Sequence, residues 1–103
     1  MADARRELLV ASRAAADIAD AAAWYEAQRV GLSIEFIHAL DQAFDAVAER
    51  PTTFRIVRSG IRRALLRRFP YGVFFVEEQA SVTVLAVIHA RRHPRVWPSR
   101  PAR

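Results

Sequence analysis

Apolar positions in the first half of the chain recur with the period of a helix. Residues 13–29 form one such segment, and a short apolar run at residues 5–11 precedes it and predicts a strand. Ser12, between the two, is expected to cap the helix with its hydroxyl. The apolar positions at helical spacing within the segment are Ile18, Ala22 and Tyr25.

A second helix is predicted between Gly31, which stops the first, and Pro51, which ends the second. Ser33 is expected to cap it. Its apolar stripe recurs at steps of four, four and three, through Phe36, Leu40, Phe44 and Val47. Acidic residues follow another face at i, i+4 spacing and repel one another there, so that face is expected to meet water or a cationic partner. With so short a connection, the two helices form an antiparallel hairpin.

From Ile61 onward the sequence is rich in β-branched and aromatic residues. Its runs IRRALLRRF, YGVFFVEE and SVTVLAVIHARR predict three consecutive antiparallel strands. A bend at Phe69-Pro70-Tyr71 and a turn at Glu78-Gln79-Ala80 separate them, and residues 51–60 are expected to be a connecting loop. The order β-α-α-β-β-β predicts an α+β two-layer sandwich, with the helical hairpin packed on a small, mainly antiparallel sheet.

Length and composition place this fold in one domain without covalent or metal support. The 103 residues suffice for a single core, which we assign to residues 1–93, with a Pro- and Arg-rich tail at residues 94–103. The absence of cysteine excludes disulfides and thiolate metal sites and fits a reducing compartment. No signal-peptide pattern or membrane-length apolar stretch is present, so we expect a cytoplasmic protein without membrane association.

The charges are divided unequally along the chain. All 16 cationic residues are arginine. Residues 1–49 hold four of them against nine acids, a net charge of −5, whereas residues 50–103 hold twelve against two acids, a net charge of +10. This asymmetry predicts an acidic or nucleic-acid partner for the second half.

Several motifs, in order, carry a family resemblance over nearly the whole chain. Trp24-Tyr25 follows an A-x-x-D-I-like segment, and Pro51 closes the second helix. The later segments R-R-F-P-Y, residues 67–71, and V-L-A-V-I-H-A-R-R, residues 84–92, match most closely. With these features the chain resembles the RelE/ParE toxins of bacterial type II toxin–antitoxin systems, which include plasmid stabilisation toxins.

This resemblance implies growth arrest by one of two activities. ParE-type members poison DNA gyrase, and RelE-type members cleave messenger RNA on the ribosome. Either activity implies a cognate antitoxin, of the ParD kind for a ParE-like toxin, and a toxin–antitoxin hetero-oligomer. We expect the antitoxin to supply an acidic amphipathic tail that folds on binding along the helical hairpin and the sheet edge.

A nuclease would need an acid, a base and cations that stabilise a phosphorane. The candidate acid–base and clamp residues are Tyr71, His89, Arg91, Arg92 and His93. Lysines that some ribosome-dependent members use are absent, and Pro94 stands where others have an aromatic residue. A lone histidine at a strand end is more often a structural hydrogen-bonding group. The H-x-x-x-H spacing of His89 and His93 falls at a strand end without a third ligand, so we expect no metal and no cofactor.

The leading interpretation is therefore a ParE-like toxin that binds gyrase without catalysis. The target-binding residues would be Arg91, Arg92, Arg95 and Trp97. The antitoxin-binding residues would be Arg62, Arg63, Arg67 and Arg68. Neighbours in a strand point to opposite faces, so each arginine pair is expected to place one member on each side of a sheet with one open face. Trp24 and Tyr25 are expected to pack between helices. The alternatives are the ribosome-dependent ribonuclease and an Arg-rich nucleic-acid-binding domain.

Overall fold

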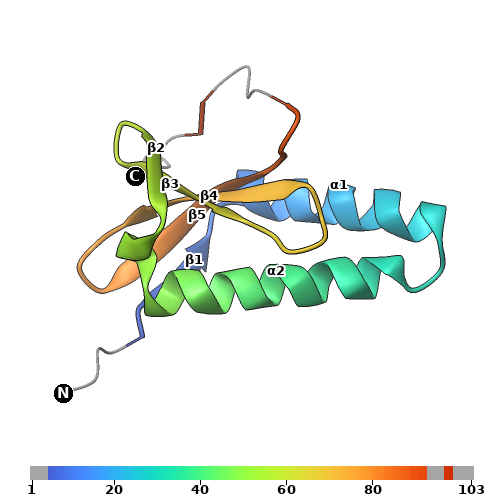
Figure 1. The fold of residues 1–103 in the computed structure, drawn as a ribbon, viewed down its shortest axis with the longest axis horizontal. Coiled ribbons are helices and arrows are strands. Elements are labelled where there is room, and N and C mark those ends of the chain that lie inside the picture. Colours follow the sequence, from blue (N-terminus) through green and yellow to red (C-terminus); the bar gives the residue numbers. More distant parts are fainter. Residues whose placement is uncertain (1–4, 93–96, 99–103) are drawn as a thin grey trace.

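A helical hairpin lies on one face of a five-stranded sheet (Figure 1). The computed structural model describes residues 5–92 together with Trp97 and Pro98. Its elements are β1 (Glu7–Val10), α1 (Ser12–Gln28), α2 (Leu32–Glu49), a 3-10 helix (Pro51–Thr53), β2 (Arg55–Arg58), β3 (Ile61–Leu65), β4 (Tyr71–Glu77) and β5 (Ser81–His89). The predicted α+β two-layer class is confirmed.

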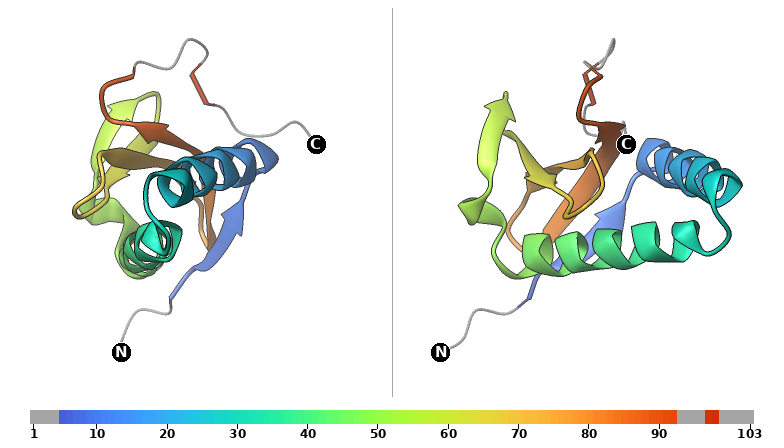
Figure 2. Two further views of the ribbon diagram at one scale, coloured as in Figure 1. Left: turned by 90° about the vertical axis from the view of Figure 1, so that its right-hand side faces the viewer. Right: turned by 45° about the vertical axis from the view of Figure 1, so that its right-hand side comes forward.

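The predicted apolar stripe of α2 forms the centre of the core. Phe36 and Val47 are fully buried and Leu40 nearly so. Tyr25 from α1 lies against Phe36, with ring centroids 5.2 Å apart, and against Phe69 from the bend after β3, at 5.0 Å. These aromatic contacts help to hold both helices in place. The two views in Figure 2 show both helices packed on the same side of the sheet.

The predicted serine caps are wrong. Ala11 precedes α1, and no side chain caps that helix, which begins at Ser12. α2 begins at Leu32 after Gly31, whose φ of 89° is accessible to glycine without a steric penalty. Ser33 turns its hydroxyl back to α1 and donates a hydrogen bond to Glu26.

The sheet has the order β1-β5-β4-β3-β2. β1 pairs with β5 in parallel, and the remaining pairs are antiparallel, so the predicted meander of the last three strands is confirmed. The predicted loop over residues 51–60 is wrong, because it contains β2. Ser59 and Gly60, with φ values of 44° and 79°, join β2 to β3 in a turn that matches the twist of paired strands.

Both faces of the sheet carry a buried cluster. The helices cover one face, where Val73 and Phe75 are fully buried. A second cluster on the other face consists of Ile61, Phe74, Val76, Leu85 and Ala86, with Val57, Ile88 and Trp97 packed against it. The sheet face that was expected to be open therefore carries buried apolar residues of its own.

The two arginine pairs differ in their setting. Arg62 and Arg63 lie in β3 opposite Phe75 and Phe74, on the two faces, as predicted. Arg67 and Arg68 follow the end of β3 and lie in the bend, where Arg68 has a φ of 69°, so the strand argument was wrong for them. Trp24 is 57% exposed and does not pack between the helices, unlike Tyr25. Neither described helix is long and apolar enough to cross a membrane.

Candidate functional site

The turn after β5 is organised by His89. Its Nδ1 accepts a hydrogen bond from the Arg91 amide at 3.1 Å, and its carbonyl oxygen accepts one from the Arg92 amide at 2.9 Å. The His89 ring lies edge-on to Tyr71, with centroids 5.2 Å apart. Because Nδ1 is occupied as an acceptor, only Nε2 is left for other contacts. This arrangement agrees with a structural hydrogen-bonding role for His89.

His89 also lines a cleft of about 920 Å³ between α1 and the end of β5, here called the α1–β5 cleft. β1 ends at Val10, opposite Val84, so the last part of β5 has no strand on that side. Asp17 from α1 takes the place of a strand and accepts a hydrogen bond from the Val87 amide at 2.9 Å. The lining residues are Arg13, Asp17, Asp20, Ala21, Trp24, Tyr25, Pro70, Tyr71, Val87, Ile88, His89 and Arg92.

The structure brings only part of the candidate nuclease set into this cleft. Tyr71, His89 and Arg92 line it, whereas Arg91 does not. His93 and Arg95 lie outside the described residues. Burial, and secondarily the neighbouring Tyr71, raise the pKa of Tyr25, so that phenol stays protonated.

The charge balance of the cleft is unfavourable for a phosphate clamp. Its two arginines, Arg13 and Arg92, face two carboxylates, Asp17 and Asp20. The arginines of β3 and the following bend do not line it. An acid and a base could be supplied here by His89 and Tyr71, but the cation excess that stabilises a phosphorane lies elsewhere.

The four expected antitoxin-binding arginines occupy separate places. Arg62 donates hydrogen bonds to the carbonyl oxygens of Phe54, at 2.7 Å, and Thr52, at 3.4 Å, and so ties β3 to the segment before β2. Arg68 donates to Glu35 at 2.9 Å. Arg63 runs across Gly72 on the other face of the sheet, where a Cβ on Gly72 would meet its side chain at 3.1 Å.

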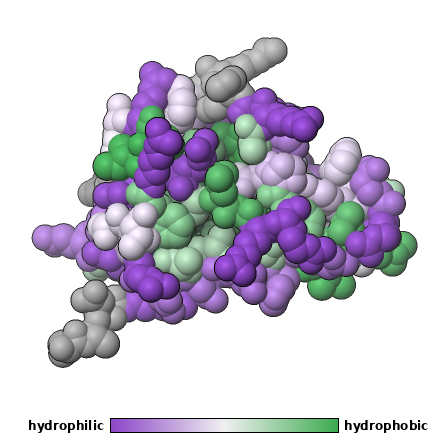
Figure 3. All heavy atoms as spheres, in the orientation of Figure 1, coloured by the Kyte–Doolittle hydropathy of each residue, from purple (hydrophilic) through white to green (hydrophobic). Residues whose placement is uncertain are grey.

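Arg67 alone of the four lies at a groove, here called the α2 groove, of about 430 Å³. Its floor is apolar, with Ala39, Ala43 and Phe54 among its residues, and Gln42, Asp45, Glu49, Arg50 and Arg67 supply its polar groups. Figure 3 shows apolar side chains flanked by hydrophilic ones on the face that α2 crosses. The arrangement fits an amphipathic segment with apolar anchors and mixed charges.

Trp97, an expected target-binding residue, lies on the sheet face opposite the helices. Its ring is 6.0 Å from that of Phe74, and the guanidinium carbon of Arg58 lies 4.9 Å from its centroid. Trp97 is thus half-buried and held between the second cluster and an arginine. We call the sheet surface around it, with Arg55, Arg58 and Arg63, the Trp97 face.

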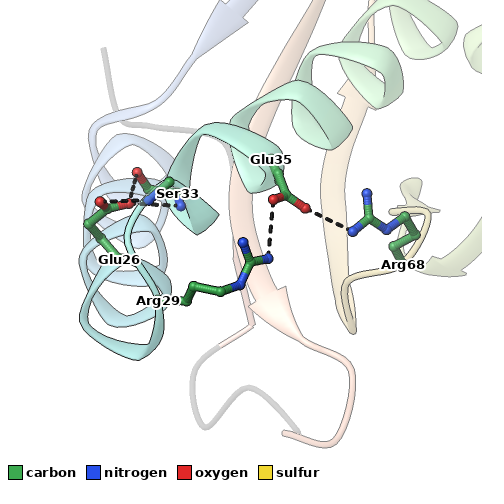
Figure 4. A network of polar contacts seen from close by, with 6 residues as sticks. Glu26, Arg29, Ser33, Glu35 and Arg68 are labelled. Atoms are coloured by element: carbon green, nitrogen blue, oxygen red, sulfur yellow. Dashed lines mark hydrogen bonds and ion pairs between the residues drawn. The ribbon is translucent and has the colours of Figure 1, made fainter.

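A polar network at the helical connection was missed by sequence reasoning (Figure 4). The Glu26 carboxylate accepts hydrogen bonds from the Ser33 hydroxyl at 2.6 Å and from the amides of Gly31 and Ser33. These bonds, led by that of Ser33, lower the pKa of Glu26. A carboxylate six positions before the start of α2, close to a glycine, is the signal that could have identified this cap.

Glu35 joins the same region to the bend after β3. It pairs with Arg68 at 2.9 Å and with Arg29 at 3.1 Å. The hydrogen bonds from Arg68 and Arg29 lower the pKa of Glu35. Within residues 5–92 and 97–98, no three metal-ligating side chains gather into a group that could hold an ion.

Comparisons with known proteins identify the family. A family model described as the ParE toxin of the type II toxin–antitoxin system parDE matches residues 8–94. Eleven chains in solved structures match, and one, from a chromosomal ParDE toxin–antitoxin system of P. aeruginosa, superposes with a TM-score of 0.75. It is 14% identical, over 84% of this chain and 98% of that chain, and its likeness shows the fold. A comparison with curated proteins gave no match. Because the family model covers most of the chain, this protein belongs to the ParE toxin family of type II toxin–antitoxin systems.

Proposed function

We propose that this toxin arrests growth by binding DNA gyrase in the cytoplasm, without catalysis, and that a cognate ParD-like antitoxin neutralises it. The observation that carries the proposal is where the uncompensated cations lie. Arg55, Arg63 and Arg91 have no carboxylate partner among the described residues and lie outside the α1–β5 cleft. The two arginines inside the cleft, Arg13 and Arg92, are matched in number by Asp17 and Asp20. Excess positive charge outside the cleft, and balanced charge within it, favour a toxin that acts by binding its target rather than by catalysis.

The proposed target surface includes Arg91 and Arg92 after β5, together with Trp97 and the expected contribution of Arg95. Arg91 and Arg92 are exposed at the end of the sheet. Trp97 is less suitable for a test, since it also packs on Phe74 and its loss would disturb the fold. The arginines are therefore the residues to change.

The test of this proposal is inhibition of supercoiling by purified gyrase, with DNA cleavage products as a second readout. We expect the wild-type chain to inhibit supercoiling and Arg91→Gln/Arg92→Gln to lose most of this effect. Arg5→Gln/Arg29→Gln, which removes the same charge from exposed ion pairs elsewhere, serves as the control. Equal inhibition by the two double variants would rule out this target surface, and no inhibition by wild type would rule out gyrase.

The α2 groove is the proposed antitoxin site. Its apolar floor would take the anchors of an amphipathic segment, and Arg67, with Arg50 beside it, would meet the acids. Arg62 and Arg68 would contribute from the edges of this region, whereas Arg63 lies on the other face of the sheet and is left out of this site. Ala43→Glu, at the partly buried floor, should weaken antitoxin binding by at least tenfold in calorimetry, whereas Ala27→Glu on α1 should leave it unchanged.

A second candidate function, messenger RNA cleavage on the ribosome, is favoured by the convergence of Tyr71, His89 and Arg92 at one cleft. Induced expression separates the two. Early loss of translation with cut messages, abolished by His89→Ala in a folded protein, would establish the nuclease. An early DNA damage response with messages intact would exclude it and support gyrase.

A further inference from the structure

Two arginines face each other across strands β2 and β3 without an acid between them. Arg55 is the direct register partner of Arg63 in this antiparallel pair. Like charges in directly opposed positions destabilise a sheet. No ion pair joins either guanidinium to a carboxylate among residues 5–92 and 97–98. The pair would be stabilised by an anion that bridges the two side chains.

Both side chains lie on the Trp97 face. Arg63 is the register partner of Phe74, which packs against Trp97, and its stem crosses Gly72, two residues earlier on the same strand. Arg55, as the opposed residue, points to the same side. Arg58 completes the group, since its guanidinium lies over the Trp97 ring.

The stretch of sequence that contains these three arginines has no acidic residue. Between Arg50 and Val76 the chain has seven arginines and no acid. Of these seven, Arg68 is paired with Glu35 and Arg62 is tied to backbone carbonyls, and both lie away from the Trp97 face. The positive charge at the β2–β3 edge is therefore not balanced by acids of this stretch and attracts an external anion.

The chemistry of the face selects among anions. Most of its apolar residues are covered: Phe74 is 6% exposed, and Leu85 and Ala86 are at most 1% exposed. Leu65, 60% exposed beside Gly72, is the exception, and it also lines the α2 groove. A peptide that folds on binding needs several apolar anchors, which the α2 groove offers and the surface around Arg55, Arg58 and Arg63 does not. The Arg58 guanidinium lies over one face of the partly buried Trp97 ring, and the ring meets Phe74 in an edge-to-face contact, so Trp97 is a poor platform for an unpaired base. What the face offers is guanidinium forks, which suit phosphate groups of a duplex backbone.

We infer that Arg55, Arg58 and Arg63 bind the phosphate backbone of double-stranded DNA. The choice of DNA over other duplexes rests on the proposed gyrase function, because the substrate of gyrase is duplex DNA. The surface adjoins the proposed target residues through Trp97, so one molecule could contact enzyme and DNA together. Binding would be independent of sequence, since phosphates carry no base information.

The first test is binding of purified toxin to a short fluorescent duplex, by anisotropy, over a series of salt concentrations. Each phosphate contact contributes about 1 to the slope of log K against log salt, so Arg55→Gln/Arg63→Gln should reduce the slope by about 2 and weaken binding at every sequence. The charge-matched control, Arg5→Gln/Arg29→Gln, should keep the slope. Equal slopes for wild type and both double variants would overturn the inference, as would tighter binding of an RNA duplex or of poly-glutamate than of DNA.

A second variant removes the concern that lost binding reflects lost folding. Arg63→Glu places a carboxylate opposite Arg55 and converts the like-charged pair into an ion pair. We expect its melting temperature to equal or exceed that of wild type while DNA affinity falls at least tenfold. A stable Arg63→Glu protein with unchanged DNA affinity would overturn the inference.

The same proteins in the gyrase assay separate this inference from the proposed function. Gyrase inhibition without any DNA binding by the toxin alone would leave the function standing and remove the DNA surface. DNA binding that depends on Arg55 and Arg63, with no effect on gyrase, would retain the surface and remove the gyrase function.

Discussion

Arg62 and Arg63 are neighbours in sequence with opposite physical roles. Arg62 donates hydrogen bonds to two backbone carbonyls, whereas Arg63 lies opposite another arginine on the other face of the sheet. The sequence predicted that the two would lie on different faces, because that follows from strand geometry alone. It could not predict which one finds a partner, because the carbonyls of Thr52 and Phe54 are positioned by a 3-10 helix and a strand that the sequence pattern did not indicate.

Replacement of Arg62 should therefore affect folding more than replacement of Arg63. Hydrogen bonds made by a charged group contribute about 1.5–3 kcal/mol, so Arg62→Gln should lower the free energy of unfolding by about that amount in urea denaturation. Arg63→Gln should change it by less than about 0.5 kcal/mol. Equal losses for the two variants would contradict the assignment of Arg62 to structure.

Asp17 is the single side chain that satisfies the open edge of β5 at the Val87 amide. Asp17→Ala leaves that amide unpaired beside α1, and we expect a loss of about 1–3 kcal/mol in the free energy of unfolding. The adjacent exposed acid offers a matched control: Asp20→Ala, on the same helix face, should cost little. Hydrogen exchange at Val87 should increase in the Asp17 variant and stay slow in the control.

At the scale of elements, the helical connection shows how local rules can fail through a longer contact. Ser33 has the residue type of a cap, and its sequence position is nearly right. The cap of α2 is nevertheless Glu26 from the preceding helix, whose carboxylate accepts hydrogen bonds from the amides of Gly31 and Ser33. Helix periodicity predicted both helices and their hairpin, because those depend on a repeated pattern. A single capping contact depends on three-dimensional approach.

The connection should make the fold sensitive to acid. The pKa values of Glu26 and Glu35 are lowered in the folded chain, by Ser33 and Arg68 foremost. Their contribution to stability is therefore present above the unfolded glutamate pKa of about 4.3 and is lost as pH falls through the lower folded values. We expect the melting temperature to drop below about pH 4.5 in wild type. In Glu26→Gln it should start lower at pH 7 and depend less on pH, and identical pH profiles would exclude this role.

At the scale of the whole molecule, the sheet is a layer between two apolar clusters. β4 reads as a nearly continuous apolar run, since both of its faces are covered. This explains why alternation in the sequence could not reveal how the second face is used. Trp97, which was expected to contact a partner, also packs against Phe74, a contact that the sequence pattern did not indicate. The sequence did not distinguish gyrase from the ribosome as the target, because a fold does not by itself determine which of two activities a protein has.

The two clusters should contribute comparably to stability. Leu40, at 2% exposure, lies on the helix side, and Leu85, at 1%, belongs to the cluster beneath Trp97. Each change to alanine should cost about 2–5 kcal/mol in the free energy of unfolding. Leu65→Ala, at a position 60% exposed, should cost far less. A small loss for Leu85→Ala would show that the second face contributes little to the core.

The parallel pairing of β1 with β5 also limits when the fold can form during synthesis. Glu7 meets Ser81 and Val10 meets Val84, so β1 can pair only after β5, a segment far later in the chain, has been made. Contacts so distant in sequence slow folding and cannot form on a partial chain. Until β5 has been synthesised, β1 has no partner strand and the sheet lacks this pairing. A surface that depends on the completed sheet therefore cannot be presented while β5 is still inside the ribosome.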